Sequence, residues 1–598
     1  MDENRIDDFV STIHGTCSSH VVSTDSGSFV IDCGQFGPEE ISKRAEKTNW
    51  ERLFLTHFHR DQCEAASDWV DRGIPVSIPF SEKRFFEEGD VLRSSYDTYD
   101  NYTAYFQTRG ASKDIAGDPV TDYDSLSCAG LDVQAIPLPG HTFGSVGYCF
   151  ELKGVRYLAC GDLMASASKL HEYYSSQWSY MSFQGHVNLL ESLEAVKNLR
   201  VDWILPGHGA PFRAEDADLN DLSTKLAELY ELFYASPYKP FVPVFNRLSE
   251  HVYEVRNSAA NTYIIRDDDG HGVFIDCGYV GNAPITSNPH RFIDHLTPYL
   301  QAETGVSDVE WFLPSHYHDD HLAGLPTLQI KYGTKVASSP EVKDILEHPE
   351  RFEMPCLVPH RTTVDRVIER DETFHWRGID FRMEQFPGQT WYHHLITFDV
   401  DGKRYLSIGD NISGLGFREN RDFIHSFIPK NRTPVSSYRD MPRQIKERQP
   451  DVILTGHGCG VTVDPEQVDR WQVWMDRWTE LWTETLDQPH PNLGMDPHWV
   501  EFYPFKVRAK PGAGVTFEIR VRNHEDERRT GVIVLSATGG ATVDPERIDL
   551  DIDAGDTTSY SLQIQTPDAV STHSWTVLAD VTWNGSHLGR VAEGIVYW

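Results

Sequence analysis

The sequence has few basic residues, no long apolar run and no closely spaced pair of cysteines, and each deficit excludes a class of protein. Only 54 lysine and arginine residues stand against 90 aspartate and glutamate residues, which gives a formal net charge of −36. Such a surface repels phosphate backbones and anionic membranes, so we expect neither a nucleic acid nor a membrane as partner. The absence of any apolar run of about 18 residues excludes a transmembrane helix.

Cysteine is absent from the patterns that would give it a redox or metal-binding role. The chain has nine cysteines and none forms a C-x-x-C pair, so we expect reduced and mostly buried thiols. The N-terminus, MDENRIDDFV, lacks both the basic and the apolar segment of a signal peptide. These features predict a cytoplasmic protein.

An internal repeat accounts for most of the 598 residues. SGSFVIDCGQF (residues 27–37) matches HGVFIDCGYV (271–280), and WERLFLTHFH (50–59) matches VEWFLPSHYH (309–318). The copies are far longer than the roughly 20–50 residues of a solenoid repeat, so a whole domain is duplicated. We predict one copy in residues 1–240, a second in 241–495 and a different domain in 496–598.

The pattern of the last domain is that of short strands. Phe517, Ile519 and Val521 alternate with charged residues, and turn signals such as Pro511-Gly512 separate the apolar runs. About seven short strands in about 95 residues are typical of an immunoglobulin-like β-sandwich. This domain has no catalytic constellation, so we expect it to brace the second repeat. Binding of a partner or a glycan is the alternative.

A stripe of tryptophans precedes this domain. Trp471, Trp474, Trp478 and Trp482 are spaced so that they share one face of a helix. We expect a packing face within the domain, with a contact between copies in a homo-oligomer as the alternative.

Each repeat carries an ordered set of imidazoles and carboxylates. Residues 56–62 read THFHRDQ and residues 315–321 read SHYHDDH, and in each copy P-G-(H/Q)-T, G-D and G-H-G follow in that order. The motifs follow short apolar runs that indicate buried strands, so their side chains should converge on one rim of a sheet. A lone H-x-H is weak evidence, but the complete set in the same order twice strongly indicates metal sites.

The order and spacing of these motifs resemble the metallo-β-lactamase superfamily over roughly residues 1–490. The resemblance implies an α/β fold of two tandem αβ/βα sandwiches ahead of the all-β domain, and usually a zinc-dependent hydrolase. In that family the first metal takes the two H-x-H histidines, the G-H-T histidine and a bridging aspartate. The second metal takes the next aspartate and histidine of the motif, the same bridging aspartate and the last histidine.

Carried over to repeat one, the resemblance gives a complete first-metal set and an incomplete second-metal set. The first set is His57, His59, His141 and Asp162. The second is Asp61, Asp162 and His208, with Gln62 where the family has a histidine.

Repeat two shows the opposite defect. Its second-metal set is complete and consists of Asp320, His321, Asp410 and His457. Its first-metal set is His316, His318 and Asp410, with Gln389 where the family has a histidine. His393 and His394 follow closely, and either could substitute for the missing ligand.

The glutamines shape the expected chemistry. An amide oxygen is a poor substitute for imidazole, so each repeat should have one tight and one weak zinc position. A bound metal lowers the pKa of water from 15.7 to about 7, and the resulting hydroxide would attack an ester, thioester, lactone, amide or phosphoester of a small molecule. Asp162 and Asp410 would hold the metals, while Asp61 and Asp320 would orient the nucleophile or accept its proton. A second metal would stabilise the oxyanion.

Substrate contacts are expected from the segment after each bridging aspartate, which often lines the pocket in the resembling family. The candidates are Lys169, Gln177 and Trp178 in repeat one and Arg418 in repeat two. Residues 80–124, rich in tyrosine and phenylalanine, form either a lid or a packed excursion.

Two other functions remain open. Some superfamily members that resemble persulfide dioxygenases use one iron held by two histidines and one aspartate, and repeat one retains such a set. Alternatively, one repeat is catalytic and the other is a scaffold or binding domain. The absence of H-x-E-x-D argues against a flavodiiron oxygen reductase.

Overall fold

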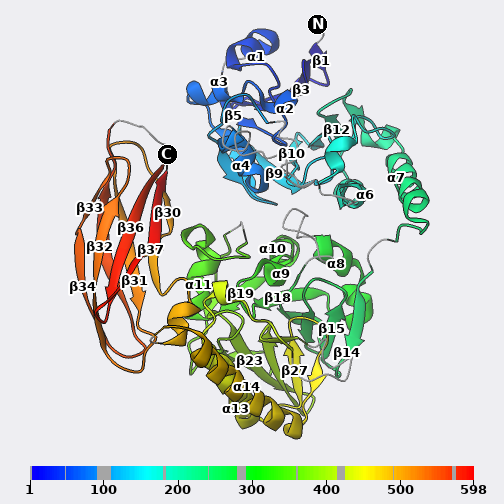
Figure 1. Ribbon diagram of the computed structural model, residues 1–598. Coiled ribbons are helices and arrows are strands. Elements are labelled where there is room, and N and C mark those ends of the chain that lie inside the picture. Colours follow the sequence, from blue (N-terminus) through cyan, green and yellow to red (C-terminus); the bar gives the residue numbers. More distant parts are fainter. Residues whose placement is uncertain are drawn as a thin grey trace. The chain divides into compact units, whose positions relative to one another are not determined.

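The chain divides into two units in the computed structural model (Figure 1). One unit comprises residues 1–241 with 282–291, and the other comprises residues 242–281 with 292–598. The structure describes residues 3–46, 49–89, 110–178, 184–239, 242–278, 291–358, 361–413, 424–488, 490–568 and 574–597.

The first unit, which contains repeat one, has two sheets and six described α-helices. The seven-stranded sheet runs in chain order through β1 (Glu3–Arg5), β2 (Val10–His14), β3 (Ser18–Ser23), β4 (Ser28–Ile31), β5 (Trp50–Phe54), β6 (Val76–Pro79) and β7 (Asp118–Val120). The six-stranded sheet has the order β13-β12-β11-β10-β9-β8, with bounds β8 (Ser125–Cys128), β9 (Leu131–Pro137), β10 (Val146–Leu152), β11 (Val155–Gly161), β12 (Trp203–Pro206) and β13 (Phe212–Arg213). The helices are α1 (Pro38–Ala45), α2 (Arg60–Cys63), α3 (Ala66–Asp71), α4 (Lys83–Glu87), α6 (Gln184–Leu199) and α7 (Leu219–Tyr234).

Strand β4 shows how the layers arise. Phe29 and Ile31 belong to a buried cluster between the two sheets, whereas Val30 belongs to a cluster that includes Trp69 of α3. Successive residues of a strand point to opposite faces, so a strand covered on both faces is apolar throughout. On the second sheet, Leu158 of β11 packs in one cluster with residues of α6 and α7. The unit is therefore a helix–sheet–sheet–helix sandwich, as predicted.

Repeat two occupies the second unit together with the all-β domain. Its seven-stranded sheet runs through β14 (Val244–Arg247), β15 (Val252–Arg256), β16 (Thr262–Arg266), β17 (His271–Ile275), β18 (Asp308–Leu313), β19 (Lys335–Ser338) and β20 (Arg366–Val367). Its six-stranded sheet has the order of β21 (Phe374–Trp376), β22 (Ile379–Gln385), β23 (His394–Val400), β24 (Lys403–Gly409), β27 (Val452–Thr455) and β28 (Val461–Thr462), and β25 (Ile412–Ser413) pairs with β26 (Ile424–His425). The helices are α8 (Arg291–Thr304), α9 (Asp319–Leu322), α10 (Leu325–Tyr332), α11 (Pro340–Glu347), α13 (Val435–Arg448) and α14 (Pro465–Thr485).

The two repeats share strand order and strand direction. In each seven-stranded sheet the first four strands are antiparallel and the last four are parallel, so β4 pairs with β5 as β17 pairs with β18. In each six-stranded sheet one parallel pair, β11 with β12 or β24 with β27, stands among antiparallel neighbours. The predicted duplication of an αβ/βα sandwich is confirmed.

The tryptophan stripe lies on α14 and packs within repeat two, apart from one residue. Trp471 is buried, and Trp478 contacts Tyr438 of α13 with ring centroids 5.3 Å apart. Trp482 lies against Phe427 at 5.6 Å. Trp474 is 51% exposed. Three residues turn a helix by about 300°, so Trp474 stands at the edge of the stripe rather than at its centre.

The all-β domain forms two sheets around a shared core. The four-stranded sheet has the order of β29 (Val500–Tyr503), β31 (Gly514–Arg522), β35 (Thr557–Gln565) and β33 (Thr542–Asp544). The five-stranded sheet has the order of β30 (Lys506–Arg508), β37 (Ser586–Tyr597), β36 (Ser574–Trp583), β32 (Arg529–Ala537) and β34 (Arg547–Ile552). The two-sheet sandwich is as predicted, but it has more strands than the expected seven because two three-residue strands carry no alternation to detect. The immunoglobulin-like topology stays a prediction.

Two expectations from composition agree with the structure. All nine cysteines are free, and seven of them are buried. Among the described residues, no helix has both the length and the apolar character needed to cross a membrane.

Candidate metal centres

The H-x-H histidines of each repeat lie in a turn between a buried strand and a short helix. β5 precedes His57, and α2 begins directly after His59. In repeat two, β18 and α9 flank His316 and His318 in the same way. The strand fixes the backbone on one side of the turn, so the imidazoles are held at the rim of the sheet where the sequence places them.

A glycine precedes each bridging aspartate, and the backbone requires it there. Gly161 has a φ of 52° and Gly409 a φ of 51°, both in the left-handed region. A Cβ on Gly161 would lie 2.8 Å from Thr56 Oγ1. Glycine therefore allows the end of β11 to approach the H-x-H turn closely and to bring Asp162 to it.

A buried aspartate outside the ordered ligand motifs supports the first H-x-H turn. Asp32 accepts hydrogen bonds from the backbone N (2.9 Å) and Oγ1 (2.8 Å) of Thr56, and that Oγ1 lies 3.1 Å from His57 Nδ1. Because Thr56 Oγ1 donates to Asp32, it accepts from His57 Nδ1–H, which leaves the lone pair of His57 on Nε2. Burial raises the pKa of Asp32 to about 8, against the effect of the two hydrogen bonds.

Asp276 plays the same part in repeat two and also contacts a candidate ligand. It accepts hydrogen bonds from the N and Oγ of Ser315, both at 2.7 Å, and lies 2.9 Å from His321 Nδ1. Ser315 Oγ in turn lies 2.9 Å from His316 Nδ1. The signal that could have found both aspartates is the I-D-C-G segment, which stands in both copies.

Glu82 is a second buried support of repeat one, and no described contact shows a counterpart in repeat two. Its carboxylate accepts hydrogen bonds from the backbone N of Phe58 (2.9 Å), the backbone N of Gly144 (3.1 Å) and the hydroxyl of Thr142. It therefore joins the H-x-H turn to the G-H-T turn. Burial raises the pKa of Glu82 to about 7, although these hydrogen bonds oppose the shift.

Replacing Glu82 with glutamine should reduce the pH dependence of stability. In the folded chain this carboxyl stays protonated up to a pKa of about 7, whereas its ordinary value is 4.5. Its contribution to the free energy of unfolding is complete below pH 4.5 and is lost as pH rises through the folded-state pKa of about 7. The free energy of unfolding in urea should fall by roughly 2–3 kcal/mol more in the parent protein than in Glu82→Gln between about pH 5 and pH 8. Equal falls would contradict the assignment.

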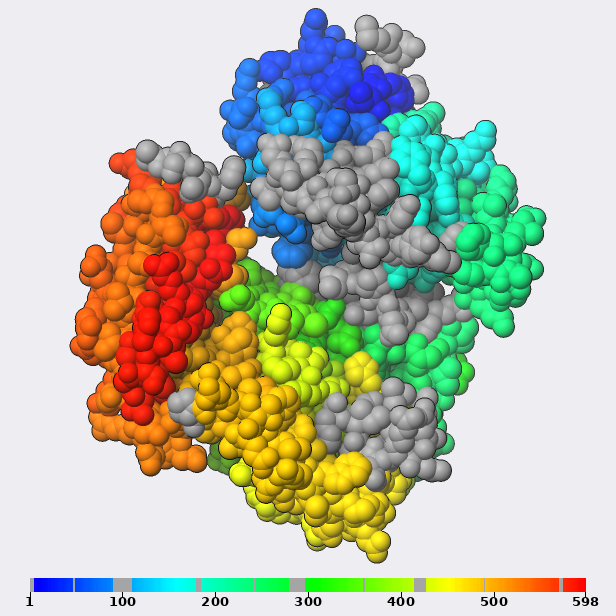
Figure 2. All heavy atoms as spheres, viewed as in Figure 1, coloured from blue at the N-terminus to red at the C-terminus, as the bar shows by residue number. Residues whose placement is uncertain are grey.

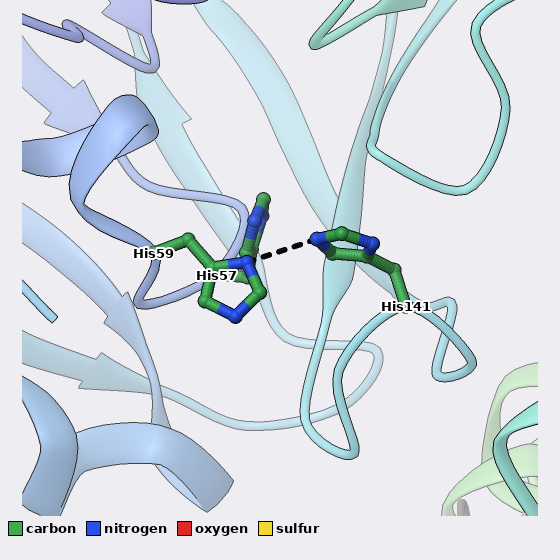
Figure 3. Close-up of side chains that lie close together, drawn as sticks. All are labelled: His57, His59 and His141. Carbon is green, nitrogen blue, oxygen red and sulfur yellow. Dashed lines mark hydrogen bonds between the residues drawn. The ribbon is translucent and has the colours of Figure 1, made fainter. Parts of the chain in front are cut away.

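The first-metal residues of repeat one converge as predicted (Figure 3). His57, His59 and His141 are buried, and one ring nitrogen of each lies within 4.8 Å of the others. His59 Nδ1 and His141 Nε2 share a hydrogen bond of 2.9 Å. Asp162 Oδ2 lies 3.4 Å from His141 Nε2 and 3.9 Å from His57 Nε2.

The second-metal position of repeat one is filled by protein groups. Asp61, Asp162 and His208 lie together, but Gln62 Nε2 donates a hydrogen bond to Asp162 Oδ1 at 2.9 Å. His208 Nδ1 lies 3.0 Å from the same oxygen, and its Nε2 bonds the carbonyl oxygen of Thr16 at 3.0 Å. Burial alone would lower the pKa of His208, but the hydrogen bond and charge of Asp162 raise that pKa to about 9.

The second-metal residues of repeat two are brought together as predicted. His457 Nε2 lies 3.2 Å from Asp410 Oδ2 and 3.4 Å from Asp320 Oδ2. His321 Nε2 lies 3.1 Å from Asp410 Oδ1. One ligand atom from each of these four residues lies within 4.8 Å of the other three.

These separations suit a divalent metal ion. Ligands about 2.0–2.1 Å from one tetrahedral ion lie about 3.3–3.4 Å apart, close to the 3.1 Å and 3.4 Å measured from His321 to Asp410 and from His141 to Asp162. His321 Nε2 and Asp410 Oδ1 are buried, and neither has a hydrogen-bond partner among the described residues. An ion between them would satisfy both atoms. The residues therefore fit one metal at the complete position of each repeat.

Neither histidine after Gln389 takes the place of the missing ligand. His394 is occupied on both ring nitrogens, Nε2 with Ser339 Oγ at 2.5 Å and Nδ1 with the Pro314 carbonyl oxygen at 3.3 Å. His393 stacks on His316 with ring centroids 3.9 Å apart, and its Nε2 accepts a hydrogen bond from the backbone N of Asp410 at 3.1 Å.

Comparison with known proteins agrees with this architecture. The family model of the metallo-β-lactamase superfamily matches residues 13–208 and, separately, residues 255–457. The chain belongs to the metallo-β-lactamase superfamily. A search of curated proteins found no significant match.

Solved structures of superfamily members match with low identity. A metallo-β-lactamase from Pontibacter korlensis is 16% identical, with a TM-score of 0.30, and the match covers 39% of this chain and 99% of that one. A superfamily protein from the archaeon Sulfolobus tokodaii is 18% identical, with a TM-score of 0.28 and coverages of 37% and 85%. A metallo-β-lactamase from Elizabethkingia meningoseptica is 17% identical, with a TM-score of 0.30 and coverages of 40% and 92%.

The predicted substrate residues differ in their exposure. Lys169 and Gln177 are exposed, but Trp178 is buried in the same apolar cluster as Phe58 and thus has a packing position. The sequence alone does not distinguish a tryptophan that packs in a core from one that contacts a ligand. Arg418 lies outside the described residues.

The segment after Asp162 places two further residues beside the predicted ligands. The ring of His171 stacks on His208 with centroids 3.6 Å apart, and Glu172 Oε1 lies 4.0 Å from His141 Nε2. Of the predicted lid or excursion, residues 90–109 lie outside the described residues. The described Phe85 and Ile115 pack in the core beside α3, which favours a packed excursion at its two ends.

Proposed function

We propose that the protein is a zinc-dependent hydrolase of small molecules that carry an ester, thioester, lactone, amide or phosphoester. The observation that carries this proposal is one complete metal position per repeat at the sheet rim of a metal-dependent hydrolase-type fold, with neighbouring donor atoms 2.9–3.9 Å apart in repeat one and 3.1–3.4 Å apart in repeat two. A divalent ion at such a position supplies Lewis acidity and an activated water at neutral pH.

The residues around the complete position of repeat one have separate tasks. His57, His59 and His141 would hold the ion together with Asp162. Asp61 lies 3.4 Å from His208 Nε2, and its side chain is 27% exposed. Because the adjacent position has lost its histidine, we assign Asp61 to orienting the water and accepting its proton. In repeat two Asp320 belongs to the complete set, so there it would act as a ligand.

A mononuclear iron enzyme that uses oxygen is the second candidate. It is supported by the three imidazoles and one carboxylate of repeat one, since imidazole suits iron as well as zinc and the neighbouring position is occupied by the Gln62 amide. A third arrangement has one catalytic repeat and one scaffold repeat. It is supported by Glu82, which joins two turns of repeat one and has no counterpart among the described contacts of repeat two.

Metal content and turnover of the purified full chain test these candidates together. Elemental analysis should find zinc, and chelator treatment followed by zinc should abolish and restore hydrolysis in a panel of aryl esters, thioesters, lactones, amides and phosphodiesters. Iron, together with oxygen uptake on a persulfide substrate, would replace the hydrolase with the second candidate. A chain that retains no metal and hydrolyses nothing in the panel would overturn the proposal.

A further inference from the structure

We propose that the C-terminal sandwich holds two side-chain amides, those of Gln389 and Asn431, against the predicted ligands of the first-metal position of repeat two, so that this position is closed to metal. The proposal rests on the proposed function only for the ion at the neighbouring complete position. We call Gln389 and Asn431 the amide pair.

Gln389 presents the wrong atom to the bridging aspartate. Its Nε2 donates a hydrogen bond to Asp410 Oδ2 at 2.9 Å, and an amide nitrogen has no lone pair with which to bind a metal. A flipped amide would set its oxygen against the carboxylate, so the partner fixes the orientation. The backbone is held as well, because Gln389 N donates to Asn411 Oδ1 at 2.9 Å and its carbonyl accepts from Thr433 Oγ1 at 2.8 Å.

Asn431 fixes the tautomer of a predicted ligand. Its Nδ2 lies 3.1 Å from His318 Nε2, and an amide NH2 can only donate to that ring nitrogen, so the ring proton of neutral His318 is on Nδ1. The equivalent His59 of repeat one turns its Nδ1, not its Nε2, toward the first-metal set. Asn431 is fully buried at the end of the 3-10 helix η5 (Pro429–Asn431), and its carbonyl accepts a hydrogen bond from the backbone N of Trp391 at 3.2 Å. The amide therefore cannot leave without moving the loop that carries it.

Distance is not what closes this position. Donor atoms of His316, His318 and Asp410 still lie within 4.8 Å of one another. What is missing is a free lone pair on His318 Nδ1, which carries the ring proton while Asn431 donates to Nε2. Gln389 Nε2 also uses one acceptor site of Asp410 Oδ2. His316 Nε2 is the imidazole donor of the set that stays without a hydrogen-bond partner, and a single imidazole is a weak zinc site.

Arg432 ties the residue next to Asn431 to the sandwich. Its guanidinium, which is 6% exposed, donates to Glu501 Oε1 of β29 at 2.9 Å and to the carbonyl of His498 at 2.8 Å. It also lies 3.4 Å from Asp496 Oδ1. A buried charge with such partners cannot move away from them without leaving carboxylates unpaired.

The backbone at Arg432 indicates that these contacts determine the loop. Its φ of 63° lies in the left-handed region, which a Cβ disfavours. Such a conformation persists where the surroundings hold it. The sandwich also contacts the loop that carries Gln389, because the guanidinium of Arg522 in β31 lies 3.4 Å from the ring centroid of Trp391. Figure 2 draws the sandwich in orange to red and repeat two in green to yellow.

Restoring the missing histidine should therefore fail in repeat two unless the second amide is removed as well. We would titrate cobalt(II) into metal-free full-length protein and count bound ions by elemental analysis and ligand-field absorption. The parent protein should take up two ions, and Gln389→His alone should still take up two. Gln389→His with Asn431→Ala should take up three.

Repeat one supplies the control, because no asparagine contacts Asp61, Asp162 or His208 among the described contacts, and the hydrogen bond of His208 Nε2 to the Thr16 carbonyl is exposed, so an ion can displace it. Gln62→His alone should raise the count to three. Every variant must retain the two parental ions, which shows that both repeats are folded. If the parent protein bound fewer than two ions, the proposed metal function would be wrong. If Gln389→His alone bound a third ion, the proposed blocking by the amide pair would be wrong, and the metal function would stand.

The role of the sandwich is tested by removing its contacts with the loop that carries Asn431. In the Gln389→His background, Arg432→Gly keeps the left-handed backbone but removes the ion pairs, so Asn431 should move and a third ion should bind. Glu501→Gln in the same background weakens one pair and should give partial uptake. If Gln389→His/Arg432→Gly bound two ions while Gln389→His/Asn431→Ala bound three, the Asn431 amide would block the position without help from the sandwich. That result would overturn the proposed role of the sandwich.

Discussion

Alanine at both His57 and His59 should remove one metal ion per chain and leave the other in place. These residues supply two of the three imidazoles at the complete position of repeat one, whose donors lie within 4.8 Å of one another. With one imidazole and Asp162 left, the affinity should fall by well over 100-fold, since loss of a mere supporting residue already costs about 10–100-fold. Elemental analysis after dialysis measures the count, and turnover by repeat one should fall with it.

The same change in the matching motif of repeat two is the control. Alanine at His316 and His318 should leave the metal count unchanged, because the amides of Gln389 and Asn431 already close that position to metal. The two double variants remove identical groups from equivalent turns. Equal losses of metal in both, or a loss only in the His316 and His318 variant, would contradict our assignment of the complete positions.

Asp276→Ala should weaken the metal of repeat two by about 10–100-fold. Asp276 is the acceptor for His321 Nδ1 at 2.9 Å and also holds Ser315 through two hydrogen bonds. Without it, the ring of His321 loses its orientation and the carboxylate that increases its basicity. Competition with a chromophoric chelator would measure the change in affinity.

Asp32→Ala provides the comparison in the other repeat. Asp32 reaches His57 only through Thr56, so the metal of repeat one should weaken by less than that of repeat two does in Asp276→Ala. Each substitution should leave the ion of the opposite repeat unchanged. If either substitution weakened metal binding equally in both repeats, the cause would be a general loss of structure. The aspartate would then not act as a local support of its own metal site.

The repeat architecture and the complete ligand sets could be predicted because they depend on local order. Strand-forming runs precede each motif, and strand ends meet at one rim, so His57, His141 and Asp162 converge although they are far apart in sequence. The superfamily resemblance assigned each predicted ligand to a metal position, and it rested on the same ordered motifs.

What sequence could not give was the direction of polar hydrogens and the contacts made by distant loops. Gln62 and Gln389 were expected to be weak ligands, but both turn their amide nitrogen toward the bridging aspartate. Asn431 reaches His318 from a loop that carries no motif. The burial of Trp178 depends on packing that no local pattern reveals.

Anomalous scattering from a crystal of the full chain, recorded at the zinc and iron edges, tests the central claim most directly. We predict one peak in each repeat. The first should lie among His57, His59, His141 and Asp162, and the second among Asp320, His321, Asp410 and His457, both at the zinc edge. Peaks at all four positions, or a peak between His316 and His318 or between Asp61 and His208, would contradict the account.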